Sequence, residues 1–315
     1  MSTSTRFAAL WLTGAIALMA VPLVLSPYYV GLVVTMMVFA LFAMSLDLLL
    51  GYAGMPSLGH AAFFGMAAYT TGLLALKAEW AVWFALPAGI AMAVLTSIVF
   101  GLLALRTRGS YFLMITLALS QVLWGIAFGW RSLTGGDDGL PDIPRPEMGL
   151  PWSMSGNTAF YYFVMLLFVV ATMALVRITG SPFGYVLRGI RESESRMLAL
   201  GYDVWRYKLV AFALAAAFAG LAGCLYVYFN RFVSPDYVHV VRSAEVLLMV
   251  ILGGAGTLIG PAVGATLIVL LENLISTYTE RWVTVLGIIY VLVALLAPNG
   301  IAGLIASLRR HRAGP

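Results

Sequence analysis

The dominant feature of this sequence is a series of apolar stretches that follow one another with only short polar links between them. Each is close to the roughly 20 residues that a helix needs to cross the hydrocarbon core of a bilayer. Only 10% of the 315 residues are charged and 62% are hydrophobic, whereas soluble domains carry about 25% charged residues. The sequence therefore predicts an all-α, polytopic transmembrane helical bundle, a single domain over residues 1–315, and excludes a water-soluble fold.

About ten of these apolar segments are predicted to cross the membrane. Their approximate bounds are residues 7–25, 30–50, 61–76, 81–105, 110–130, 159–176, 209–229, 244–258, 262–278 and 283–297. Three of them, at 61–76, 244–258 and 262–278, are short for a full crossing, which predicts tilting, breaks or re-entrant stretches there. The first segment also resembles a signal peptide, but its length and the lack of a clear cleavage pattern favour a retained helix.

The basic residues predict the orientation of this bundle. With the N-terminus in the cytoplasm, twelve of the 18 Lys and Arg residues fall on the cytoplasmic side, as the positive-inside rule requires. Both termini are then cytoplasmic. The remaining six basic residues, Arg242 among them, fall outside, as does Glu245.

Two links are longer than a turn. Residues 131–158 are rich in Gly, Pro and Asp, which predicts an external loop built from turns. This loop is either a docking surface for an external partner or simply a solvated segment. Residues 177–208 are predicted to form a cytoplasmic loop.

The loop at 177–208 carries helical signals of its own. Ser181 followed by Pro182 is typical of a helix start, and Gly201 of a helix end. We expect a short exposed helix in which Glu192 and Arg196 form a favourable pair four residues apart. Two interpretations are open: a helix that lies on anionic lipid, or one that fits into a cytoplasmic motor protein and transmits its movement.

Several motifs in sequence order resemble those of the branched-chain amino acid ABC transporter permeases, and fit the LivM-like branch of that family better than the related LivH-like branch. They are SLDL at 45–48, GYAG at 51–54, SLGHAAFFG at 57–65, GSYF at 109–112, TGG at 134–136, DGL at 138–140, SPFG at 181–184, LRGIRE at 187–192, LG at 200–201, YKL at 207–209, AFAGLAG at 217–223 and GGAGTLIGP at 253–261. Together these motifs extend over about residues 40–300.

The resemblance implies that the loop at 177–208 supplies the coupling helix seated on the ATP-binding subunit. The residues it assigns to this contact are Arg188, Arg191, Glu192, Ser193, Glu194, Met197, Leu198 and Gly201. It further implies a second related permease subunit, two ATP-binding subunits and an external substrate-binding protein as partners. The implied location is the bacterial inner membrane, and the implied substrates are branched-chain or similar hydrophobic amino acids.

Glycines and rare polar groups within the apolar spans predict helix breaks and a translocation path. Breaks or re-entrant segments are expected at 51–59 and 253–261, because irregular backbone at membrane depth must face protein or a water-filled cavity. The candidates are Asp47, Gly54, Ser57, His60, Thr116, Gln121, Gly254 and Gly256. Simple helix packing is the simpler interpretation for the glycines, and a hydrogen-bonded packing role for His60. A structural pairing is expected for Asp47.

Several other functions are disfavoured by what the sequence lacks. No G-x-x-x-x-G-K-[S/T] motif occurs, so ATP hydrolysis belongs to separate subunits, and no catalytic motif indicates an enzyme. We expect no cofactor, no metal at the single Cys224, and no nucleic-acid partner. An ion-coupled secondary transporter would need carboxylates in the membrane core, where only Asp47 and Glu272 are expected. Urea, short amides and aromatic acids remain alternative substrates.

Overall fold

The computed structural model describes residues 18–146, 157–279, 281, 284, 285, 287, 288 and 291. Over these residues the chain is helical, with one isolated antiparallel bridge between Leu140 and Val233. The α-helices are α2 (Pro27–Asp47), α3 (His60–Lys77), α4 (Val82–Ala104), α5 (Ser110–Gly129), α6 (Arg131–Thr134), α7 (Asn157–Thr179), α8 (Pro182–Glu192), α9 (Glu194–Ala199), α10 (Val204–Asn230), α11 (Val240–Gly253) and α12 (Ile259–Tyr278). Short helices of other types are η1 (Leu48–Tyr52), η2 (Gly136–Asp138) and η3 (Pro235–Tyr237).

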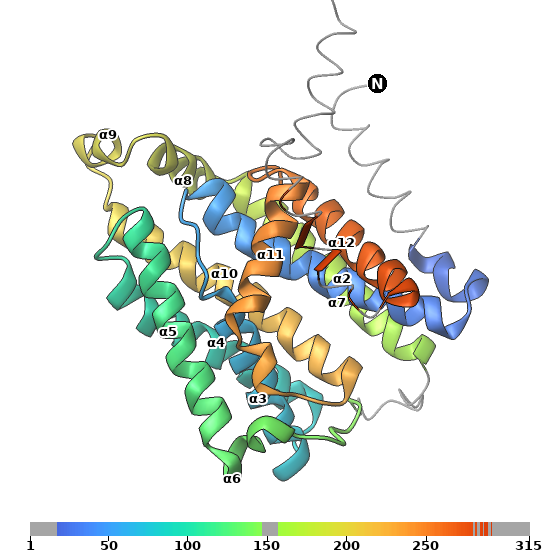
Figure 1. Ribbon diagram of the computed structural model, residues 1–315. Coiled ribbons are helices and arrows are strands. Elements are labelled where there is room, and N and C mark those ends of the chain that lie inside the picture. The colour runs from blue at the N-terminus through green and yellow to red at the C-terminus, as the bar shows by residue number, and fades with distance from the viewer. Residues whose placement is uncertain are drawn as a thin grey trace, which may run out of the picture.

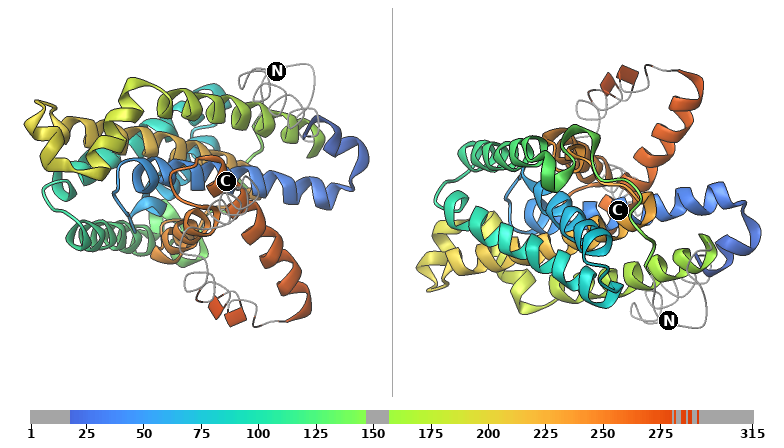
Figure 2. Two further views of the ribbon diagram at one scale, coloured as in Figure 1. Left: turned by 90° about the horizontal axis from the view of Figure 1, so that it is seen from above. Right: turned by 90° about the horizontal axis from the view of Figure 1, so that it is seen from below.

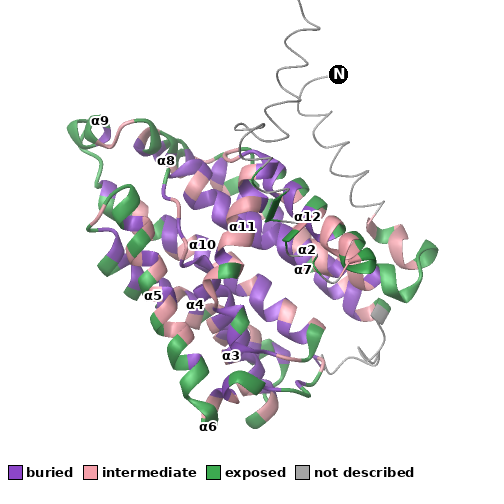
Figure 3. Ribbon diagram, in the orientation of Figure 1, coloured by how far each residue is buried: buried purple, intermediate pink, exposed green. Residues whose placement is uncertain are grey.

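The long helices form a bundle with α8 and α9 at one end and α6 at the other (Figure 1). Buried residues concentrate in α2, α3 and α10, while α5 exposes one side along its length (Figure 3). Helix α12 packs on α2 and α11, and it diverges from the body of the bundle (Figure 2). The all-α class predicted from the sequence is therefore confirmed for the described residues.

Six helices in the described part are long and apolar enough to cross a membrane. Their bounds are Pro27–Tyr52, Val82–Ala104, Ser110–Gly129, Thr158–Thr179, Val204–Asn230 and Ile259–Tyr278. The predicted segments at 61–76 and 244–258 correspond to α3 and α11. Neither helix is both long enough and apolar enough to count as a membrane-spanning candidate. The predicted segments at 7–25 and 283–297 lie largely outside the described residues, as do both termini. The chain is a multi-pass membrane protein, and its ten crossings and its orientation stay predictions.

Both predicted helix breaks are present. Helix α2 passes into a π-helix, η1, and the backbone is then irregular from Ala53 until α3 begins at His60. Helix α11 ends at Gly253, and the link to α12 contains the positive φ angles of Gly254 (103°) and Gly256 (86°). Glycine tolerates these angles without steric cost, which explains why the breaks occur here.

The loop at 177–208 differs in one respect from its prediction. As expected, Ser181 and Pro182 begin α8, and Gly201, with a φ of 86°, lies just after the end of α9. Asp203 caps α10 by accepting a hydrogen bond from the Arg206 amide. Glu192 and Arg196, however, lie in separate helices, so the prediction of one helix carrying both was wrong. Ser193 adopts extended angles (φ −162°, ψ 100°) because its hydroxyl caps α9.

The helices α3, α4 and α10 pack through small residues. A methyl group at Gly223 of α10 would overlap the Phe64 carbonyl of α3, and one at Gly220 would come within 2.7 Å of Ala93 in α4. Lipid offers no hydrophobic drive between helices, so close backbone approach supplies the packing energy instead. The AFAGLAG motif is therefore a packing surface.

Gly223→Ala is expected to destabilise the protein by about 1–3 kcal/mol, since the added methyl group overpacks the α3–α10 contact. Gly125→Ala in α5 is the matched control, because in the described part of the chain its methyl group would meet no atom within 4 Å. That control should be neutral or slightly stabilising. Thermal unfolding of both variants in detergent tests this, and equal melting temperatures would contradict the packing argument.

Candidate functional site

Asp47 ties the end of α2 to the link between α11 and α12. Its Oδ1 accepts a hydrogen bond from the Gly256 amide at 2.6 Å, and its Oδ2 accepts one from the Leu258 amide at 2.9 Å. The side chain is fully buried. These amides lie just before the first residue of α12, where unpaired N–H groups and the helix dipole favour a negative charge. The structural pairing expected for Asp47 is therefore present.

The π-helix η1 brings a third element to this point. The Gly51 carbonyl accepts a hydrogen bond from Nη1 of Arg191, which lies in the last turn of α8. A side chain at Gly51 would overlap both the Asp47 carboxylate and the Gly256 backbone. We call the set Asp47, Gly51, Arg191, Gly256 and Leu258 the Asp47 junction, because it joins α2, α8 and the α11–α12 link.

Helix α8 makes two further contacts with the same region. The Arg188 guanidinium lies over the Tyr52 ring at 4.9 Å and over Tyr185 at 5.6 Å. The Arg191 stem packs against Gly54, where an added Cβ would lie 3.0 Å from Arg191 Cγ. A cation over an aromatic face contributes about 0.5–1 kcal/mol when exposed. Helix α8 is thus attached to η1 by both of its arginines.

Helix α9 is held by ion pairs. Glu194 pairs with Lys208 of α10 at 2.8 Å and with Arg108 of the α4–α5 link at 3.3 Å. Met197 is buried beneath Gly189 of α8. In contrast, Leu198 and Leu200 are 49% and 66% exposed. The short helix therefore presents leucines at the end of the bundle while its base is fixed.

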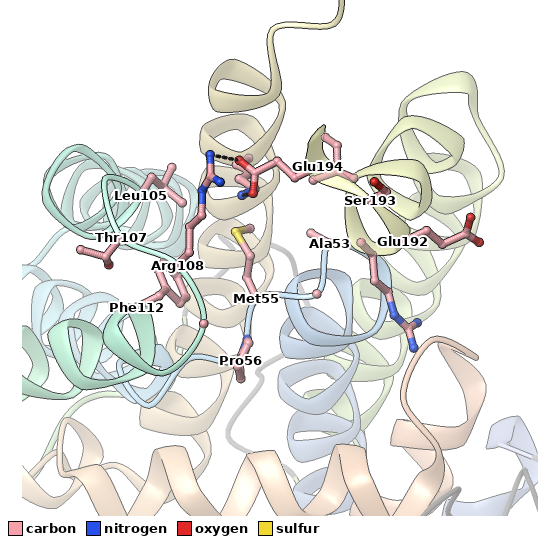
Figure 4. Close-up of a pocket in the computed structure, with 15 residues that line it drawn as sticks. Ala53, Met55, Pro56, Leu105, Thr107, Arg108, Phe112, Glu192, Ser193 and Glu194 are labelled. Carbon is pink, nitrogen blue, oxygen red and sulfur yellow. Dashed lines mark hydrogen bonds and ion pairs between the residues drawn. The ribbon is translucent and has the colours of Figure 1, made fainter. Parts of the chain in front are cut away.

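A cavity of about 220 Å³ lies between these elements. Figure 4 shows Met55 and Pro56 on one wall, Arg108 and Phe112 on another, and Ser193 and Glu194 near its rim. The charged residues that border it are Arg108, Arg191, Glu192, Glu194 and Lys208. The cavity thus brings together residues from both predictions. Gly54 was predicted for the translocation path, and Arg191, Glu192, Ser193 and Glu194 were predicted for the contact with the ATP-binding subunit.

The other predicted path residues make internal contacts. His60 Nε2 lies 2.8 Å from the Ser45 hydroxyl, and its ring stacks on Phe42. Thr116 accepts a hydrogen bond from the Leu58 amide at 3.3 Å, and Ser57 accepts one from Gly59 at 3.2 Å. These three side chains are fully buried, so each has the packing role of a residue beside a helix break. Gln121 is partly buried on α5.

The structure places two charged residues together in one helix. Arg242 and Glu245 were predicted to fall on the outer side of the membrane, at the start of the apolar segment 244–258. Both lie in α11, which begins at Val240 and packs on α2 and α12. Their spacing of three residues within a helical pattern was the signal that could have placed them together.

Comparison with known proteins gives the family. Residues 28–296 match the family described as branched-chain amino acid transport system, permease component. The chain belongs to this family. The expectation drawn from the sequence motifs is confirmed.

Individual members of the family show the same relationship. The high-affinity branched-chain amino acid transport system permease protein LivM of Escherichia coli K12 is 30% identical over 302 residues, covering 89% of this chain and 71% of the relative. The LivH permease of the same strain is 24% identical over 281 residues, covering 84% and 91%. A probable LivM of Methanocaldococcus jannaschii is 29% identical over 195 residues, covering 60% and 55%. No solved structure matches this chain.

Asp47→Ala is expected to destabilise the protein by about 1–3 kcal/mol for each buried amide that loses its acceptor. Asp47→Asn keeps one acceptor oxygen and the shape, so its loss should be smaller. Asp138→Ala, at an exposed carboxylate, is the control and should unfold like the unmodified protein. Melting temperatures in detergent decide the matter, and an Asp47→Ala value equal to that of the control would refute the role of the junction.

Proposed function

We propose that this chain is the permease subunit of an ATP-binding cassette importer that carries branched-chain or similar hydrophobic amino acids across the bacterial inner membrane. The family match over residues 28–296 and the LivM and LivH relatives support the class and the substrate. The chain itself performs no chemistry and needs no cofactor, since ATP is hydrolysed by partner subunits.

The partners follow from the same proposal. LivM and LivH are both similar to this chain, which supports a pair of related permeases in one importer. Two ATP-binding subunits would bind the end that carries α8 and α9, and an external binding protein would deliver the amino acid to the opposite end. Residues 131–146 of the predicted external loop lie at that opposite end. Both termini would be cytoplasmic.

The Asp47 junction is the observation that carries this proposal. A hydrogen bond from Arg191 connects α8 to Gly51, and Asp47 connects the same turn to Gly256 and Leu258. Packing inside proteins is close and transmits displacement. Movement of α8 by an ATP-binding subunit therefore shifts the end of α2 and the α11–α12 link together.

Leu198 of α9 and Leu200 just after its end, both exposed, supply the contact surface. In an alternative arrangement α9 would rest on anionic lipid through its basic neighbours. Lys208 and Arg108, however, already form ion pairs with Glu194. Two of the basic groups available to lipid phosphates near α9 are thus paired within the chain. This supports docking into a protein groove, where apolar residues on one helix face provide the anchors.

Leu198→Asp is expected to weaken binding of the ATP-binding subunits by about tenfold or more, because it places a charge in an apolar contact. Ser195→Asp adds the same charge to the same helix without removing an apolar group, and it should assemble normally. Copurification of the complex from membranes measures the difference. Full assembly of the Leu198→Asp variant would contradict the docking role of α9.

Arg191→Ala is expected to preserve assembly but to reduce ATP-driven leucine uptake by about tenfold or more, since it removes a charge-assisted hydrogen bond between α8 and η1. Arg196→Ala in α9 is the matched control. Uptake into proteoliposomes containing the whole importer is compared with ATP hydrolysis by the same sample. If leucine uptake in vesicles persists with an ion gradient alone and no ATP-binding subunit, the importer proposal itself is wrong and an ion-coupled transporter is indicated.

A further inference from the structure

Two charged side chains pair on α11, and a third lies on the neighbouring helix α12. Arg242 and Glu245 lie one turn apart on α11 and form an ion pair at 2.9 Å. Glu272 lies on α12, which packs on α11. We call these residues the charged triad. One positive and two negative groups leave it with one negative charge in excess.

The triad lies well away from the Asp47 junction along α11 and α12. Helix α11 has 14 residues, about 21 Å at 1.5 Å per residue, whereas the hydrocarbon core is about 30 Å thick. Counted from Gly253 at the Asp47 junction, Glu245 lies about 12 Å and Arg242 about 17 Å along the helix. Counted from Ile259, Glu272 lies about 20 Å along α12. All three therefore lie about 12–20 Å from the Asp47 junction along their helices.

The chain that leads into α11 is irregular and lies beside the middle of α5. Val238, just before α11, accepts a hydrogen bond from Ser120 in the middle of α5 at 3.1 Å. Ser243 in the first turn of α11 accepts one from the Ala61 amide of α3 at 2.9 Å. Irregular backbone at membrane depth occurs only where it is buried in protein or lines a water-filled cavity. Helices interrupted near the midplane are also the common setting of transporter substrate sites.

Aromatic rings border the triad. The Arg242 guanidinium lies over the Phe39 ring of α2 at 5.7 Å, and Tyr226 of α10 lies 5.4 Å from the same ring. The side chains of Arg242 and Glu245 remain 27% and 28% exposed within the described part of the chain. Exposure of such charges to lipid costs about 2.5–3.5 kcal/mol each. This face of the bundle must therefore adjoin water or another protein.

We propose that the charged triad lines the translocation path and binds the ammonium and carboxylate groups of an α-amino acid in transit; this rests on the function proposed above. The carboxylate receives hydrogen bonds from Arg242, and the ammonium donates to Glu272 and Glu245. The aliphatic side chain of the amino acid contacts the rings of Phe39 and Tyr226. When the path is empty, Arg242 is neutralised by Glu245.

The charges of the triad favour a zwitterion over the alternative substrates. Urea and short amides carry no charge to compensate the desolvated triad. An aromatic acid carries a negative charge only, and the excess negative charge repels it. An α-amino acid alone supplies both a partner for Arg242 and one for the unpaired carboxylate.

The test uses the whole importer in proteoliposomes, with leucine delivered by its binding protein. Leucine uptake and ATP hydrolysis are measured on the same sample. Glu272→Gln is expected to lower the uptake per ATP hydrolysed about tenfold or more, because a charge-assisted hydrogen bond is lost. ATP hydrolysis stimulated by the loaded binding protein should persist. Glu79→Gln, the same substitution at an exposed carboxylate in the link between α3 and α4, should retain the unmodified ratio.

Glu272→Asp separates charge from packing. It retains the carboxylate in a shorter side chain, so it should recover most of the uptake that Glu272→Gln loses. An unchanged ratio in Glu272→Gln overturns the proposal, as does equal impairment in both variants. Loss of stimulated ATP hydrolysis in both variants assigns the carboxylate to assembly and overturns it too. If the unmodified importer carries no amino acid, the proposed function fails instead, before any variant is compared.

Discussion

The need to satisfy every polar group away from water shapes this protein more than any other constraint. Helix ends leave unpaired amides and carbonyls, and each costs free energy when buried without a partner. The structure meets this need at the start of α12 with the carboxylate of Asp47, which comes from a distant part of the sequence. Because that carboxylate pairs two amides of the α11–α12 link, the interrupted helices are fixed relative to α2.

The same constraint explains the glycines around the junction. Gly51 and Gly256 bring two backbones into contact beside the Asp47 side chain, leaving no space for a Cβ atom. The π-helix at Leu48–Tyr52 turns the Gly51 carbonyl toward Arg191. Single-turn π segments often mark functional sites. Helix breaks, close backbone approach and a basic side chain from α8 are therefore parts of one arrangement.

Much of this arrangement was predictable from the sequence. The six long apolar segments correspond to helices, since hydropathy and length are direct consequences of the bilayer. Glycine and proline marked the breaks at 51–59 and 253–261, because both residues restrict or release the backbone locally. The contact of Asp47 with Gly256 was beyond prediction, since 209 residues separate the two. The sequence also left Arg242 out of the helix that begins at Val240, because a hydropathy pattern treats charge as a sign of water, whereas here Arg242 pairs with Glu245.

The two helices at the α8–α9 end are attached by different forces, and this gives them different sensitivity to ions. Arg108 is 73% exposed where it pairs with Glu194, so dissolved salt screens that attraction. The bond from Arg191 to Gly51 is partly buried and lies beside the enclosed Asp47 carboxylate, where screening is weak. Rising ionic strength therefore weakens the link from α9 to Arg108, while the more enclosed pair of Glu194 with Lys208 and the attachment of α8 persist. Salt thus frees the α4–α5 link from α9 without detaching α9 from α10.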